Sequence, residues 1–139
     1  MEGRQDPEWV KNVANKKLVY RVSPRGDISC RGNIPYVADD ESQRLMDVYV
    51  PTDGNAVGIH PAILFVHGGP IPANLATLPK DWRIFRDYAR LAATVGLAGV
   101  TFNHRRFGLS SYPDAAEDVW AALEYVRANA ESLLVDKNS

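Results

Sequence analysis

The sequence predicts an α/β fold, in which helices pack on a sheet that contains parallel strands. Two short apolar runs, at residues 61–66 and 97–102, have the length and composition of buried strands. The segment between them has the apolar spacing of an amphipathic helix. The order strand, helix, strand is typical of a crossover between parallel neighbours, which is the unit from which α/β folds are built.

The first 26 residues show no sustained periodicity and are interrupted by proline and glycine. We expect residues 1–26 to form a loosely attached N-terminal arm, with a short helix near residues 9–16. The rest of the chain, residues 27–139, is predicted to form a partial α/β domain.

Two segments rich in β-branched and aromatic residues follow the arm, Asp27–Val37 and Arg44–Val50. The polar stretch between them, residues 38–43, suits a connection on the surface. We therefore expect the two segments to pair as an antiparallel hairpin at one edge of the sheet.

A helix is predicted after the strand at 61–66, but it begins only near residue 81, because three prolines in residues 70–80 prevent a regular helix there. Asp81 is expected to cap its first turn, and Gly96 to end it in a left-handed conformation. Its apolar face consists of Trp82, Phe85, Ala89, Ala92 and Val95.

A second crossover helix is predicted in the last third of the sequence. Ser111 and Asp114 have the spacing of a capping box at its start. Apolar residues then recur at helical spacing, namely Ala116, Val119, Trp120, Leu123, Val126 and Ala130.

Composition excludes several classes of function. The chain has 139 residues, 45% of them hydrophobic and 24% charged, with a formal net charge of −1, so nothing in its overall charge favours nucleic acid or an anionic membrane as a partner. Three histidines and one cysteine at unsuitable spacings do not predict a metal site. Cys30 has no partner for an internal disulfide, and the opening residues lack the apolar core of a secretory signal, so a cytoplasmic location is expected.

The motif that points to chemistry is His67-Gly68-Gly69-Pro70, which directly follows the strand at 61–66. Glycines let the backbone approach a ligand closely, and α/β sheets bind ligands at the carboxyl ends of their parallel strands. The amides of Gly68 and Gly69 can donate to a negatively charged oxygen, whereas Pro70 has no N–H. A plain tight turn is the alternative interpretation.

Taken in order, four segments resemble the α/β-hydrolase superfamily, especially its carboxylesterase-like and dienelactone-hydrolase-like branches. They are the strand at Leu45–Pro51, the His-Gly-Gly loop, the strand and turn at Val100–Arg105, and the helix start at Pro113–Val119. The resemblance covers roughly residues 27–136. It implies that the chain forms the N-terminal part of an α/β-hydrolase sheet.

The resemblance also implies roles for the loop after the strand at 61–66. The amides of Gly68 and Gly69 would form an oxyanion hole, and His67 and Pro70 would shape the loop. The substrate implied is a small ester or related acyl compound, and no cofactor is implied. Residues 71–80, an apolar loop stiffened by proline, would form one wall of an acyl pocket.

By the same resemblance, Asn103, His104 and Arg105 form a structural turn rather than part of a catalytic triad. The sequence contains no Gly-x-Ser-x-Gly nucleophile elbow, and the acid and histidine of such a triad normally follow the serine. Ser110 and Ser111 lack the closing glycine and are read as helix-capping residues. We therefore expect this chain to hold no nucleophile, acid or base of a triad and to be inactive alone.

Two other functions remain open from the sequence. The chain could be a noncatalytic binding or assembly module, since a sheet that ends early exposes a strand edge for self-association or for a complementing chain. It could also be a phosphate-binding domain of the flavodoxin-like or Rossmann-like kind. That second alternative is weaker, because the glycine turn lacks the Gly-x-Gly-x-x-Gly spacing.

Overall fold

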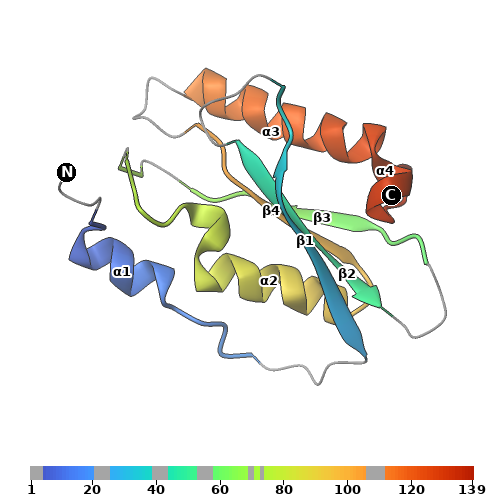
Figure 1. Ribbon diagram of the computed structural model, residues 1–139, viewed down its shortest axis with the longest axis horizontal. Coiled ribbons are helices and arrows are strands. Elements are labelled where there is room, and N and C mark those ends of the chain that lie inside the picture. The colour runs from blue at the N-terminus through green and yellow to red at the C-terminus, as the bar shows by residue number, and fades with distance from the viewer. Residues whose placement is uncertain are drawn as a thin grey trace.

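The computed structural model describes residues 5–20, 26–38, 44–52, 58–68, 71–72, 74–105 and 112–139. It shows a mixed sheet between two helical layers (Figure 1). The strands are β1 (Asp27–Pro35), β2 (Leu45–Thr52), β3 (Ala62–Phe65) and β4 (Ala98–Phe102). The helices are α1 (Glu8–Ala14), the 3₁₀ turn η1 (Pro79–Asp81), α2 (Arg83–Thr94), α3 (Tyr112–Ala128) and α4 (Ala130–Leu133).

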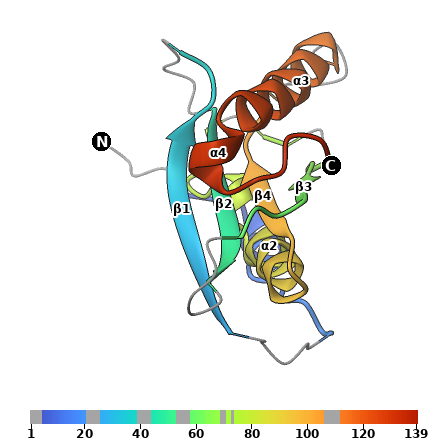
Figure 2. The same ribbon diagram turned by 90° about the vertical axis from the view of Figure 1, so that its right-hand side faces the viewer.

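The described strands lie in the order β1-β2-β4-β3, which can be followed from one side of the sheet to the other in Figure 2. β1 pairs with β2 as an antiparallel hairpin, and β2 is also antiparallel to β4. β3 and β4 are parallel, from Ala62 opposite Ala98 to Phe65 opposite Thr101. The predicted hairpin and the predicted parallel pair joined through a helix are both confirmed.

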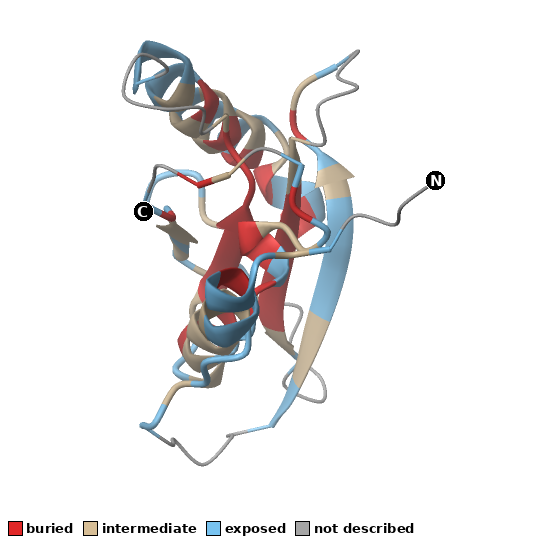
Figure 3. Ribbon diagram, turned by 90° about the vertical axis from the view of Figure 1, so that its left-hand side faces the viewer, coloured by how far each residue is buried: buried red, intermediate tan, exposed pale blue. Residues whose placement is uncertain are grey.

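The two faces of the sheet are covered by different helices, because side chains alternate along each strand. Met46, Val48 and Val50 of β2 belong to the main core together with residues of β4, α3 and α4. Tyr49, on the opposite face of β2, packs against Ala89 and Ala93 of α2. The inner strands β2 and β4 are therefore buried, whereas β1 is largely exposed (Figure 3).

Residues 6–18 of the arm are docked on the domain, whereas a loose attachment was expected. Val10 of α1 is fully buried in a second apolar cluster with Ile71, Leu75 and Trp82. Asp6 accepts hydrogen bonds from the amides of Ala76 and Thr77, at 2.6 and 3.0 Å. The arm is thus docked by apolar burial and by charge-assisted hydrogen bonds, which the prolines around it do not reveal in the sequence.

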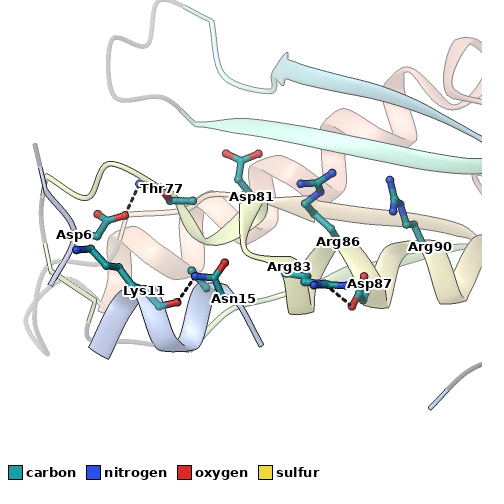
Figure 4. Close-up of a pocket in the computed structure, with 10 residues that line it drawn as sticks. Asp6, Lys11, Asn15, Thr77, Asp81, Arg83, Arg86, Asp87 and Arg90 are labelled. Carbon is teal, nitrogen blue, oxygen red and sulfur yellow. Dashed lines mark hydrogen bonds and ion pairs between the residues drawn. The ribbon is translucent and has the colours of Figure 1, made fainter. Parts of the chain in front are cut away.

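A charged cleft of about 430 Å³ lies beside the docked arm, between α1 and α2 (Figure 4). Asp87, one of its lining residues, accepts a hydrogen bond from the amide of Leu18 at 3.0 Å and forms an ion pair with Arg83. Its carboxylate therefore holds the end of the arm against α2.

Helix boundaries differ from expectation at two points. Asp81 does not cap α2: the N-cap position is Trp82, and the Asp81 carboxylate pairs with Lys80 instead. Gly96 does follow the helix with a φ of +92°, as predicted. Ser110 and Ser111, the expected caps of the last long helix, lie outside the described residues.

Three residues of the predicted apolar faces are exposed, Val95, Ala116 and Trp120. Val95 lies just beyond the last turn of α2. In α3 the buried stripe runs through Asp118, Ala122 and Val126, and Trp120 lies two residues from it, which places its side chain on the opposite side of the helix. None of the helices in the described ranges has both the length and the apolar character required to cross a bilayer.

α2 lies close to the sheet at Gly99 of β4. A Cβ added there would lie 2.3 Å from the backbone oxygen of Ala89. A glycine is required because any side chain would collide with helix backbone, which cannot rotate away.

We predict that Gly99→Ala lowers the free energy of unfolding by about 3 kcal/mol, the upper end of the range for overpacked cores. Urea unfolding followed by far-UV circular dichroism measures this change. Gly68→Ala is the matched control, because a Cβ there meets no atom within 4 Å, and its unfolding midpoint is expected to equal that of the wild type. Equal midpoints for all three proteins would contradict the close packing of α2 on β4.

Candidate functional site

The candidate site lies where β3 and β4 end side by side. Because these strands are parallel, the residues that follow them, His67-Gly68 and Asn103-His104-Arg105, emerge at the same edge of the sheet. Nε2 of His104 lies 3.0 Å from the backbone oxygen of His67. The two imidazole rings also stack, with centroids 3.7 Å apart and an interplanar angle of 5°.

His67 is buried, and the residue after it is open to solvent. Its ring lies between His104 on one side and Phe85 of α2, whose ring meets it edge-on at 6.3 Å. Its Nδ1 is 3.0 Å from the backbone oxygen of Gly68. Gly68 is exposed, and the space where its side chain would be is empty within 4 Å. Gly69 and Pro70, the other residues expected in this loop, lie outside the described residues.

Asn103 links the end of β4 to three other elements. Its amide N–H donates to Leu45 of β2 at 3.0 Å, and its side-chain oxygen accepts from the amide of Lys80 in η1, also at 3.0 Å. Its backbone oxygen accepts from the hydroxyl of Tyr36, which follows β1. The side-chain Nδ2 is buried without a hydrogen-bond partner among the described residues. These contacts fix where the chain leaves the sheet.

A buried ion pair that the sequence did not reveal supports the same region. Nζ of Lys80 lies 3.1 Å from Oδ1 of Asp47 and 2.7 Å from Oδ1 of Asp81. The lysine side chain is 2% exposed and that of Asp47 8%. The amide of Asn33 completes the set by donating to Asp47 at 2.8 Å. Asp47 itself was the signal available in the sequence. It is an acidic residue within an apolar strand, and a buried carboxylate requires a partner.

Arg105 ties the turn to α3 through the buried carboxylate of Asp118. The Arg105 amide donates to Oδ2 at 2.7 Å, and its guanidinium donates to both carboxylate oxygens at 2.9 to 3.1 Å. Arg44 adds a further bond at 2.8 Å. Burial alone would raise the pKa of Asp118, but the hydrogen bonds from Arg105 and Arg44 outweigh it and lower the pKa below its usual range. The hydrogen bond to Asp118 in turn raises the pKa of the Arg105 guanidinium.

Both ring nitrogens of His104 lie close to backbone carbonyl oxygens in this region. Its Nδ1 is 2.8 Å from the backbone oxygen of Arg105, and its Nε2 faces the oxygen of His67, so both ring nitrogens face carbonyl groups. A general base would instead have one nitrogen free to reach a nucleophile. Cys30 lies in β1, and burial raises the pKa of its thiol. Within the described ranges, no group of three or more histidine, cysteine and carboxylate side chains is arranged to hold a metal ion.

The loop after the glycine turn differs from expectation in what covers it. The loop at residues 71–80 was expected to form one wall of an acyl pocket, but its Ile71 and Leu75 are buried against α1 and Trp82. The indole N–H of Trp82 donates to the backbone oxygen of Thr77 at 3.0 Å, which holds the loop against the start of α2. The apolar side of this loop is therefore occupied by the arm.

Comparison with known proteins shows the family to which this chain is related. Residues 46–139 match the BD-FAE family. Gibberellin receptor GID1A of Arabidopsis thaliana is 32% identical over 102 residues, covering 73% of this chain and 27% of the receptor. The chain thus spans about a quarter of the length of that relative.

Two solved structures show the same fold. A bifunctional GH43-CE protein of Bacteroides eggerthii is 28% identical, with a TM-score of 0.62 over 78% of this chain and 13% of its own. Brefeldin A esterase, a bacterial homologue of human hormone sensitive lipase, is 22% identical, with a TM-score of 0.66 over 92% of this chain and 35% of its own. The predicted α/β-hydrolase fold is confirmed.

We predict that Asp118→Asn lowers the free energy of unfolding by about 2 kcal/mol at pH 7. This is less than the 3–5 kcal/mol of a fully buried pair, because Arg44 and Arg105 keep contact with water. The folded pKa of Asp118 lies below its unfolded value of about 3.9, so its contribution is complete above that value. It is lost as the pH falls through the lower, folded pKa.

Urea unfolding at a series of pH values from 3 to 7 tests this sign. The difference between wild type and Asp118→Asn is expected to be constant at neutral pH and to shrink only in the acid range. Asp114→Asn, at an exposed carboxylate near the same arginine, is the matched control and is expected to change stability by less than about 0.5 kcal/mol. A gap that widens on acidification would show that Asp118 is not held as a carboxylate.

Proposed function

This chain belongs to the BD-FAE family, and from that premise we propose that it is the N-terminal portion of a serine hydrolase acting on carboxylic esters or related acyl substrates. Within that enzyme it supplies the oxyanion-hole loop, while the nucleophile, acid and base come from outside residues 1–139. On this proposal the chain is inactive alone.

One observation carries this proposal: at the carboxyl end of a parallel strand, a buried histidine is followed by an exposed glycine. His67 is 4% exposed, and Gly68 has open space where a side chain would be. A ligand can approach the exposed glycine, and the buried histidine before it holds the preceding peptide against the core. This is the combination that a preorganised oxyanion donor needs.

The chemistry follows from the position of that amide. In ester hydrolysis, an activated serine attacks the carbonyl carbon, and the carbonyl oxygen becomes a negatively charged tetrahedral oxyanion. The amide of Gly68, with that of Gly69, would donate to this oxygen and lower the barrier. The ester class agrees with the names of the structural relatives, which include brefeldin A esterase and a carbohydrate esterase from gut microbiota.

A second candidate function is a noncatalytic binding or assembly module. Two observations favour it. The curated relatives of this chain are named gibberellin receptors, so this fold also occurs in binding proteins. β3 lies at the end of the described strand order, and just before it His60 forms an isolated parallel bridge with Val135. Ile63 and Val66 are exposed beside that edge.

We predict that the chain alone is not labelled by a fluorophosphonate probe and does not hydrolyse p-nitrophenyl acetate. Mixed with a fragment of a BD-FAE relative that supplies a Gly-x-Ser-x-Gly elbow, it is expected to gain turnover, because the donor loop and the nucleophile are then combined. Stoichiometric labelling of the chain alone, at Ser110 or Ser111 for example, would overturn this account.

In the complemented enzyme, Gly68→Pro is expected to lower kcat by roughly 10²- to 10³-fold, because proline has no N–H to donate to the oxyanion. Gly68→Ala keeps the amide and has room for its methyl group, so it is the matched control and retains turnover near that of wild type. If both variants hydrolyse the ester equally fast, Gly68 does not act as a donor.

Among the described strands β3 lies at an edge, and this predicts concentration-dependent self-association of the chain alone, measured by size-exclusion chromatography with light scattering. Ile63→Lys places a charge beside that edge and is expected to shift the chain toward monomer. Val95→Lys, at a comparably exposed site at the end of α2, is the control and leaves the distribution unchanged. A compact monomer at every concentration would count against both an incomplete sheet and the assembly function.

A further inference from the structure

We propose that His104 is a positioning residue for the oxyanion loop: its Nε2–H donates to the backbone oxygen of His67 and thereby sets the direction of the Gly68 N–H. This inference rests on the proposed function for what that amide does. It goes beyond the proposed function because it names the group that orients the Gly68 N–H, the imidazole of His104 in the neighbouring turn.

The argument begins with the peptide bond between His67 and Gly68. A trans peptide is planar, so its C=O and N–H point in opposite directions from one rigid unit. Nε2 of His104 lies 3.0 Å from the oxygen of this unit. A hydrogen bond that holds this oxygen on one side therefore also holds the Gly68 N–H on the other side of the same planar unit, at a residue that is exposed.

His104 is itself held firmly enough to act in this way. It is 6% exposed, it stacks on the ring of His67 at 3.7 Å, and the ring of Phe102 lies 6.1 Å away. Its two neighbours in sequence are fixed by hydrogen bonds, Asn103 to η1 and Arg105 to Asp118. One residue thus contacts both the side chain and the main chain of His67.

The alternative is that the stack alone holds the loop and the Nε2 contact is incidental. The two cases differ in where a proton must be. A neutral imidazole carries one N–H, and Nδ1 of His104 also faces a carbonyl, that of Arg105, at 2.8 Å. Our proposal requires a proton on Nε2, which is present in the Nε2–H tautomer and in the imidazolium. It is absent from the Nδ1–H tautomer.

The first experiment is a long-range ¹H–¹⁵N correlation spectrum of the full chain, which reports the protonation of each histidine nitrogen. We expect the His104 signals to show a protonated Nε2 at pH 7. A neutral ring protonated at Nδ1 alone would overturn the proposal without any variant, so the test does not depend on whether a mutant folds.

The second experiment measures the one-bond residual dipolar coupling of the Gly68 N–H, which reports the direction of that bond. His104→Phe keeps a stacking ring and removes the donor, so the coupling is expected to shift away from the wild-type value. His104→Gln removes the ring and restores an N–H donor, so it is expected to shift the coupling back. His60→Gln, at a histidine that contacts a carbonyl of Gly96 elsewhere in the fold, is the control and leaves it unchanged.

Couplings of the β2 and β4 amides serve as the internal measure that each variant is folded. A wild-type coupling for Gly68 in folded His104→Phe would show that the hydrogen bond does not set the peptide direction. None of these measurements needs ester turnover. If the couplings contradict the role of His104, the hydrolase proposal still stands. If the couplings are as expected but the complemented enzyme is inactive, the role of His104 stands and the hydrolase proposal fails.

Discussion

The turn at the end of β4 is the constraint on which the rest of this structure depends. Asn103, His104 and Arg105 each bind a different part of the molecule: η1 and β2, the loop after β3, and α3. The turn therefore fixes the relative positions of the sheet edge and of the helices on its two faces. If this turn moved, the position of Gly68 and the packing of the helices over the core would both change.

Two buried carboxylates secure this arrangement from opposite faces of the sheet. Asp47 binds Lys80 on the α2 side, and Asp118 binds Arg105 and Arg44 on the α3 side. Burying charges contributes little net stability, because desolvation offsets most of the attraction, but removing one partner is costly. We regard these pairs as devices that hold loops in one geometry, which is what a site built from backbone amides requires.

The sequence predicted the sheet, the crossover through α2 and the long helix α3 well, because short apolar runs and helical spacing reflect local burial. It missed features that depend on distant residues. Nothing near Val10 indicates that it is fully buried, since the other buried residues of its cluster, Ile71, Leu75 and Trp82, are 61 or more positions away. Asp81 looked like a helix cap, but a stronger partner, Lys80, takes its carboxylate. His104 looked like a turn residue. Its contact with His67 arises because β3 and β4 are parallel neighbours whose ends lie side by side.

The central claim is that the Gly68 amide donates to the oxyanion of an ester substrate. A crystal structure of the complemented enzyme inhibited by an alkyl phosphonate tests it most directly, because the phosphoryl oxygen occupies the place of the oxyanion. The account predicts that oxygen at 2.7 to 3.1 Å from the nitrogen of Gly68. A phosphoryl oxygen bound away from this loop, with the Gly68 N–H directed elsewhere, would contradict it.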